Sequence, residues 1–181
     1  MADRGMARLA EVLRGLGLDV VRFNFLYREA QSRRPDPMPR LVECFAAVVA
    51  HAREQVGPKR LIIGGRSMGG RAASMMAADG YDCNGLLLLA YPLHPPGKPG
   101  KLRSAHLPKI RVPVLCINGT RDAFCTRELM QTALVQTKWA MHWIDGADHS
   151  FRVLKSSGRI EADVYAEIGE VGGRWLSGQI G

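Results

Sequence analysis

The chain has 181 residues, which suits one domain with a full core and is short for two, so we expect a single domain over residues 1–181. Apolar residues make up 46% and charged residues 23%, a composition that argues against extensive disorder. The formal net charge is +8, but the densest basic cluster, Arg28, Arg33 and Arg34, is interleaved with Glu29 and prolines. We therefore expect a solvated basic surface and no nucleic-acid partner, while an anionic substrate stays open.

Further features concern location and cofactors. The longest apolar run, residues 85–90, is far shorter than the roughly 20 residues of a membrane span. The opening segment MADRGMARLAEVLRGLG carries charges throughout, unlike a secretory signal, so we expect a cytoplasmic protein without a membrane partner. The cysteines form no CxxC pair and have no histidine at ligand spacing, which predicts reduced thiols. They are Cys44, Cys83, Cys116 and Cys125. Histidines and carboxylates show no metal-binding spacing either, so we expect no metal, and nothing in the sequence implies a cofactor.

The first part of the chain shows helical and strand patterns in turn. Apolar residues at helical spacing predict an amphipathic helix over 2–15, and the β-branched and aromatic residues of LDVVRFNF predict a strand over 18–25. The segment 27–39 is polar and rich in proline, which predicts an irregular loop. The helical period returns over 41–52.

The rest of the chain continues this alternation. The expected elements are, in chain order, a strand at 60–64, a helix at 71–78, strands at 85–92 and 112–119, a helix at 128–136, a strand at 138–145 and a helix at 160–175. Strands that alternate with helices and are nearly continuously apolar predict an α/β fold, a mostly parallel sheet with helices on both faces. Functional side chains are then expected just after strands, at the carboxyl edge of the sheet.

The stretch GGRSMGG (64–70) follows a predicted strand, precedes a predicted helix and contains GxSxG around Ser67. A sharp strand-to-helix turn of this kind holds its serine strained and exposed, and the small residues two positions away, Gly65 and Gly69, let the backbones pass. The stretch lacks the Lys-Ser/Thr ending of a phosphate-binding loop and does not fit GxGxxG, which argues against nucleotide binding. Ser67 is therefore the candidate nucleophile.

A serine hydroxyl is a weak nucleophile, so it needs a base and a group that orients the base. The motif GTRDAF places Asp122 after the strand at 112–119, and DGADHSF places His149 after the strand at 138–145. The order Ser, Asp, His along the chain is the one expected for this architecture. Taken alone, Asp122 would serve equally well as a helix cap and His149 as an ordinary loop histidine.

Other acids and histidines are weaker candidates. Asp145 and Asp148 are rivals for the acid, but they lie in the histidine's own loop and are poorly placed to reach its far nitrogen. His51 on a helix and His142 inside a strand are interpreted as structural. The coincidence of three residue types in order, each after a strand, favours a catalytic triad.

Together, GGRSMGGR, GTRDAF and GADHSF make the chain resemble the α/β-hydrolase superfamily. With YPLHPPGKP and LRSAHLPKIRVPVL, it resembles small bacterial hydrolases related to dienelactone hydrolase. The hydrolase-like domain of a eukaryotic histone-acetyltransferase complex subunit is in the same group. The resemblance implies that Ser67 is the nucleophile, Asp122 the acid, His149 the base and the Met68 amide an oxyanion donor.

The same resemblance concerns two loops. His94 and its neighbouring prolines match a motif typical of the group, as a wall of the substrate site or as a rigid loop. In the turn that carries Asp122, the family often has proline and glycine where this chain has Ala123 and Cys125.

The start of the chain departs from the superfamily. These folds usually begin with a strand and an HGxG-like loop that supplies the second oxyanion amide, whereas this chain starts at the helix. In the superfamily's sheet, that strand lies between the strands assigned here to 18–25 and 60–65. We expect either that the natural protein begins upstream of Met1 or that 18–25 has closed onto 60–65.

The functional prediction is a serine esterase or related acyl hydrolase that acts on a small ester, lactone or thioester. The alternative is a non-catalytic domain of the same fold that binds a protein partner. The candidate triad favours the enzyme, and the missing oxyanion loop favours the binding domain, because losing one donor costs on the order of 100- to 1,000-fold in rate.

Overall fold

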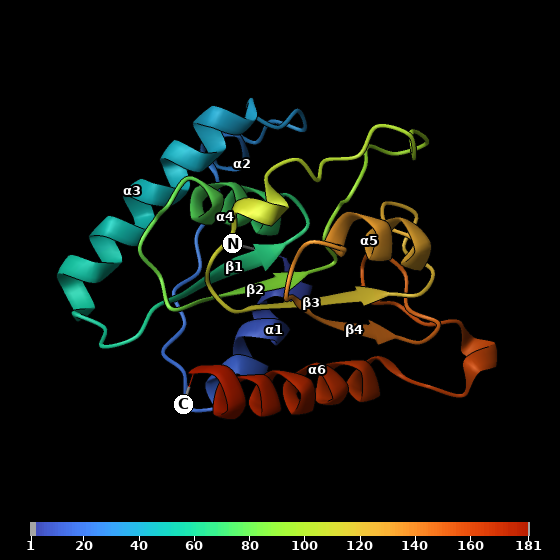
Figure 1. Ribbon diagram of the computed structural model, residues 1–181. Helices are drawn as coiled ribbons and strands as arrows, with labels where there is room; N and C mark the ends of the chain where they lie inside the picture. The colour runs from blue at the N-terminus through green and yellow to red at the C-terminus, as the bar shows by residue number, and fades with distance from the viewer. Residues whose placement is uncertain (1–2, 181) are drawn as a thin grey trace.

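The computed structural model describes residues 3–180 of the chain. At its centre is a four-stranded parallel sheet with the strand order β1-β2-β3-β4. Its strands are β1 (Ile62–Arg66), β2 (Gly85–Leu89), β3 (Val114–Gly119) and β4 (Ala140–Ile144). Helices cover both faces of this sheet (Figure 1), so the predicted fold class is confirmed.

The helices form one layer on each face of the sheet. Below it in Figure 1 lie α1 (Arg4–Gly15) and α6 (Glu161–Trp175), and above it lie α3 (Met38–Val56), α4 (Met68–Ala78) and α5 (Arg127–Leu134). The shorter elements are α2 (Leu26–Glu29), η1 (Leu107–Lys109), η2 (Lys155–Ser157) and η3 (Leu176–Ile180). Each layer encloses its own apolar core, because the sheet's side chains alternate between the two faces.

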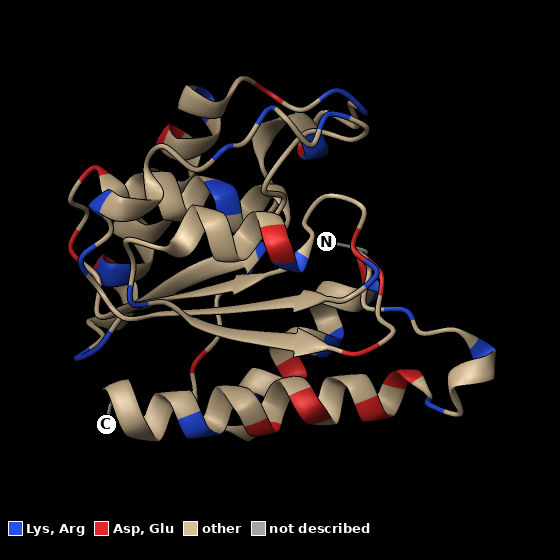
Figure 2. Ribbon diagram, turned by 45° about the vertical axis from the view of Figure 1, so that its right-hand side comes forward, with Lys and Arg blue, Asp and Glu red and all other residues tan. Residues whose placement is uncertain are grey.

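Charged residues are spread over the helices and their connections (Figure 2). No helix in the described part of the chain is long and apolar enough to cross a membrane.

Two expectations about the segment between α1 and α3 are wrong. Residues 18–25 form no strand, and residues 19–24 make no backbone-to-backbone hydrogen bond with the rest of the described chain. The predicted loop at 27–39 contains α2 and the start of α3, since Pro39 fits the first turn of a helix, where its missing N–H needs no partner.

A cleft of about 1020 Å³ separates residues 18–25 from β1, and both line it. Strand β1 is paired on its other side with β2. Leu61 O and Ser67 N–H, at the two ends of β1, are both hydrogen-bonded on the β2 side, to Asn84 N–H and Leu89 O. Because main-chain groups alternate in direction along a parallel strand, those of Gly64 face the cleft. Of the two expected alternatives, closure of 18–25 onto 60–65 is not observed, and a gap persists between them.

Strand β2 ends earlier than the predicted 85–92. Ala90 has a φ of 47°, which breaks the extended conformation. The main chain of Tyr91 pairs with the side chain of Asn118 and not with a neighbouring strand. The chain therefore leaves the sheet at Leu89, directly beside the turn that holds Ser67.

Candidate active site

Ser67 occupies a sharp turn between β1 and α4. Its φ of 53° and ψ of −117° lie in a region that residues with a side chain rarely adopt, so the backbone here is strained. Its N–H donates to Leu89 O over 2.8 Å, which ties the turn to the end of β2. Helix α4 begins at Met68, earlier than the predicted 71, so Ser67 directly precedes the helix.

The turn needs glycine at two positions, only one of which the motif predicts. A Cβ on Gly65 would lie 3.0–3.2 Å from the backbone of Gly69 and Gly70, and a Cβ on Gly70 would lie 2.7 Å from Gly65 O. A Cβ on Gly69 would meet no atom within 4 Å. Close passage of strand and helix therefore depends on Gly65 and Gly70, and the expectation for the side chain at Gly69 is wrong.

The structure brings Ser67, His149 and Asp122 into one hydrogen-bonded chain. His149 Nε2 lies 2.8 Å from Ser67 Oγ, and His149 Nδ1 lies 2.8 Å and 3.0 Å from the two carboxylate oxygens of Asp122. A carboxylate only accepts, so Nδ1 carries the proton and Nε2 is free to accept from the serine hydroxyl. This arrangement can take a proton from Ser67 as it attacks an electrophile.

Asp122 sits in a tight turn after β3. Its Oδ1 accepts from the main-chain N–H of Phe124 over 2.8 Å, and its own carbonyl accepts from Cys125 N–H. The ring of Phe124 packs against the imidazole of His149, with 4.3 Å between ring centroids. The side chain of Asp122 is fully buried, whereas that of His149 is 22% exposed. The acid is thus shielded, and the base keeps a route to solvent and substrate.

The rival acids point elsewhere. Asp148 accepts from the main-chain N–H groups of Ser150 and Arg152. Asp145 accepts from the hydroxyl of Thr120 over 3.4 Å. Both stabilise the loop that carries His149 without contacting its imidazole.

A second serine–histidine pair lies deeper in the fold. Ser74 Oγ is 2.8 Å from His106 Nε2, and the hydroxyl of Tyr91 is 3.3 Å from both. Ser74 is fully buried within α4, and burial, with the charge of Arg71, lowers the pKa of His106 to about 4. No carboxylate in the described chain is hydrogen-bonded to His106. Because no substrate can reach Ser74 there, we assign this pair to the docking of residues 91–106 on α4.

The other predicted histidines have separate surroundings. His142 is 2.7 Å from Glu167 on α6, as expected of a structural residue, and His51 is exposed on α3. His94 is 3% exposed, its Nδ1–H donates to Pro95 O over 2.9 Å, and its main-chain N–H donates to Phe124 O. His94 therefore adjoins the turn of Asp122 but does not join the chain of hydrogen bonds.

The first turn of α4 offers a main-chain N–H group that could bind the oxygen of an electrophile. The N–H of Met68 takes part in no backbone hydrogen bond with another described residue, since the first amides of a helix have no partner within it. The partial positive charge of the helix N-terminus favours negative charge at this point. Ser67 and Met68 also line the cleft beside β1, so the turn that carries Ser67 opens into that space.

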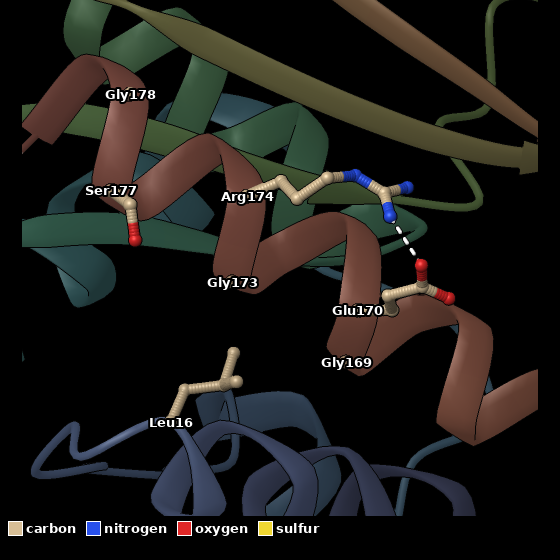
Figure 3. Close-up of a pocket in the computed structure, with 7 residues that line it drawn as sticks. All are labelled: Leu16, Gly169, Glu170, Gly173, Arg174, Ser177 and Gly178. Atoms are coloured by element: carbon tan, nitrogen blue, oxygen red, sulfur yellow. Dashed lines mark hydrogen bonds and ion pairs between the residues drawn. The ribbon is translucent and has the colours of Figure 1, made fainter.

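A second hollow lies away from this site, between the end of α1 and α6 (Figure 3). Leu16, Gly169 and Gly173 line it, and Glu170 at its rim is paired with Arg174. No histidine or cysteine lines it, so it offers no activated nucleophile. Among residues 3–180, no group of His, Cys, Asp and Glu side chains is placed to hold a metal ion.

Sequence reasoning missed one buried residue of the site. Asn118 is 0% exposed near the end of β3 and donates to Asp122 Oδ2. The available signal was a lone amide in the otherwise apolar run VPVLCING, because a buried polar side chain needs partners.

Comparisons with known proteins place this geometry in context. The sequence profile of the family described as alpha/beta hydrolase domain matches residues 1–176. The chain is similar to an alpha-beta serine hydrolase homologue from Coxiella burnetii, with 22% identity and a TM-score of 0.74 over 97% of this chain and 77% of that one.

Two further solved structures show the same likeness. One is a serine hydrolase without a lid from Xanthomonas campestris, with 23% identity and a TM-score of 0.74 over 97% of this chain and 75% of that one. The other is the esterase domain of a Rhodothermus marinus protein, with 16% identity and a TM-score of 0.69 over 98% and 81%. At these identities the likeness establishes the fold.

Proposed function

The chain belongs to the alpha/beta hydrolase domain family, and we propose that it is a serine hydrolase that cleaves a small ester, lactone or thioester. The observation that carries this proposal is the continuous chain of hydrogen bonds from Ser67 Oγ through His149 to the buried carboxylate of Asp122. The strained turn at Ser67 supports it, because such strain is stored where a nucleophile must be presented.

In the proposed reaction, Ser67 Oγ attacks the substrate carbonyl while His149 Nε2 takes the hydroxyl proton. The negative charge on the carbonyl oxygen is stabilised by the Met68 N–H, and Asp122 stabilises the imidazolium that forms. Collapse of the intermediate breaks the bond to the leaving oxygen or sulfur, which receives the proton from His149. A water molecule, activated by His149 in the same way, then releases the acid and restores Ser67.

The class of substrate follows from the groups at hand. Esters, lactones and thioesters carry better leaving groups than amides, so their carbonyls are easier targets for a serine nucleophile with a histidine base. The similarity to a solved esterase domain points in the same direction. The alternative, a binding domain without activity, is favoured by the open cleft beside β1, where the described chain supplies no second oxyanion donor of the HGxG type.

Labelling with a fluorophosphonate probe tests the proposal. Wild-type protein is compared with Ser67→Ala and with Ser74→Ala, a matched control that removes the other serine hydroxyl paired with a histidine. We expect labelling in wild type and Ser74→Ala and none in Ser67→Ala. Hydrolysis of a panel of small esters, lactones and thioesters then identifies the preferred bond.

Two results would contradict the proposal. Absence of labelling in folded wild-type protein would favour the binding domain, and labelling that survives Ser67→Ala would place the nucleophile elsewhere. Circular dichroism of each variant shows whether it has kept the fold.

A further inference from the structure

The amide of Asn118 lies at the centre of the carboxyl edge of the sheet. Its side chain makes four polar contacts: Oδ1 with Tyr91 N–H at 3.0 Å and Cys116 Sγ at 3.3 Å, and Nδ2 with Tyr91 O at 3.2 Å and Asp122 Oδ2 at 3.3 Å. Every hydrogen-bonding group of this fully buried amide therefore has a partner.

The orientation of the amide is fixed by its neighbours. The main-chain N–H of Tyr91 can only donate, so it must face Oδ1. The NH₂ group is then obliged to face the Tyr91 carbonyl and the carboxylate of Asp122, both of which accept. A flipped amide would place donor against donor at Tyr91 and oxygen against oxygen at Asp122.

The carboxylate of Asp122 depends on such donors. It is shielded from water, and a buried charge is costly unless hydrogen bonds satisfy it. The Phe124 N–H donates to Asp122 Oδ1. Asn118 Nδ2 and His149 Nδ1 donate to Asp122 Oδ2. The other titratable groups that face Asp122 are the thiols of Cys116 and Cys125, and burial raises the pKa of both, which keeps them neutral.

The same amide also reaches the strand that supports the nucleophile. Tyr91 lies two residues after Leu89, whose carbonyl accepts from Ser67 N–H. Asn118 thereby connects the acid on one side to the exit of β2 on the other.

We propose that Asn118 is a positioning residue that holds the Asp122 carboxylate against His149 and fixes it relative to Ser67. This inference rests on the proposed function, because it concerns the same hydrogen-bonded chain. Asn118 itself contacts no substrate, and its effect passes through Asp122.

The test replaces Asn118 by aspartate. Asn118→Asp keeps the size and the acceptor for Tyr91 N–H, but it replaces the NH₂ group that donates to Tyr91 O and to Asp122 Oδ2 with a carboxyl oxygen. Asn84→Asp is the matched control, because Asn84 Oδ1 accepts from Leu61 N–H at the opposite end of the sheet, away from any carboxylate of the candidate site. Both variants keep a side-chain oxygen that accepts from a main-chain N–H, and only Asn118→Asp alters the surroundings of Asp122.

We expect kcat of Asn118→Asp to fall on the order of 10- to 100-fold, by analogy with the loss seen when the hydrogen-bond partners of metal ligands are removed. KM should change little. Two buried carboxyl groups at this spacing cannot both be ionised, so one proton is shared between them and the pH–rate profile of Asn118→Asp should differ from that of the wild type. Asn84→Asp should keep the wild-type profile.

A double-mutant cycle with Asp122→Asn isolates the route of the effect. If Asn118 acts through Asp122, Asn118→Asp costs little further activity once the carboxylate is gone. Asn118→Ser, which is small, uncharged and unable to span the same contacts, replaces Asn118→Asp in these measurements if the latter does not fold, and it should lower kcat with KM preserved.

The outcomes separate two failures. A wild-type chain with Ser67-dependent activity, whose rate and pH profile are unchanged in Asn118→Asp, overturns this inference alone, as does equal loss in the Asp122→Asn background. A wild-type chain with no Ser67-dependent activity overturns the proposed function and this inference with it.

Discussion

Adding one methyl group at each of two adjacent glycines in the first turn of α4 should give two variants of different stability. Gly69→Ala and Gly70→Ala place the same side chain in the same helix, and both positions have helical, negative φ. Each gains about 1 kcal/mol in helix propensity, because alanine loses less conformational freedom on folding than glycine. That gain cancels when the two variants are compared.

The difference between them comes from contact with β1. The new Cβ meets nothing within 4 Å at Gly69 but lies 2.7 Å from Gly65 O at Gly70. Gly65 O is a backbone atom and a Cβ is fixed rigidly to its own backbone, so the clash is relieved only by moving α4 away from β1, at a cost of about 1–3 kcal/mol. For a chain of this length, that corresponds to a separation of roughly 2–12 °C between the two melting temperatures.

Differential scanning calorimetry of the wild type and both variants measures this separation. We expect Gly69→Ala to melt at or above the wild-type temperature and Gly70→Ala below that of Gly69→Ala. Equal melting temperatures would refute the assignment of Gly70 as the point of close passage. A lower value for Gly69→Ala would show that the open space beside Gly69 is filled in solution.

Two further predictions concern the acid turn and the buried histidine. In Gly119→Ala the new Cβ would lie 2.1 Å from Ala147 O, so the loop of His149 must shift away from the turn of Asp122. We expect at least a 10-fold fall in kcat/KM at nearly wild-type KM. Unchanged kinetics would contradict this prediction. Burial lowers the pKa of His106 to about 4 from its ordinary 6.5. Between pH 6.5 and pH 4 the unfolded chain therefore binds more protons than the folded chain, so the free energy of unfolding falls as the pH falls. His106→Gln should flatten this dependence in urea titrations from pH 7 to 4, and parallel wild-type and variant curves would contradict it.

The sequence predicted best the features that depend on local pattern. Continuous apolar runs identified β2 and β3, and helical spacing identified α1, α3 and α6. The position of each candidate site residue followed from one rule, that side chains placed just after parallel strands meet at one edge. The residues Ser67, Asp122 and His149 do meet there, and their catalytic roles stay predictions until tested.

Element ends were less predictable, because contacts from distant residues decide them. The end of β2 depends on Asn118, a residue of β3, which takes the main chain of Tyr91 out of the sheet. The need for glycine at position 70 depends on how closely α4 passes Gly65, and a GxSxG pattern does not encode that distance. The role of Asn118 in joining β2 to Asp122 was hidden for the same reason.

The segment LDVVRFNF shows most clearly where local reasoning stops. Its β-branched and aromatic residues favour a strand. A strand, however, is defined by a hydrogen-bonded neighbour, and here the cleft of about 1020 Å³ keeps β1 out of reach. The aromatic side chains of the segment pack on α3 instead. The ring centroid of Phe45 lies 5.1 Å from that of Phe23 and 6.4 Å from that of Phe25. Packing of these rings on α3 therefore holds the segment at the far wall of the cleft, because sliding toward β1 would break the aromatic contacts.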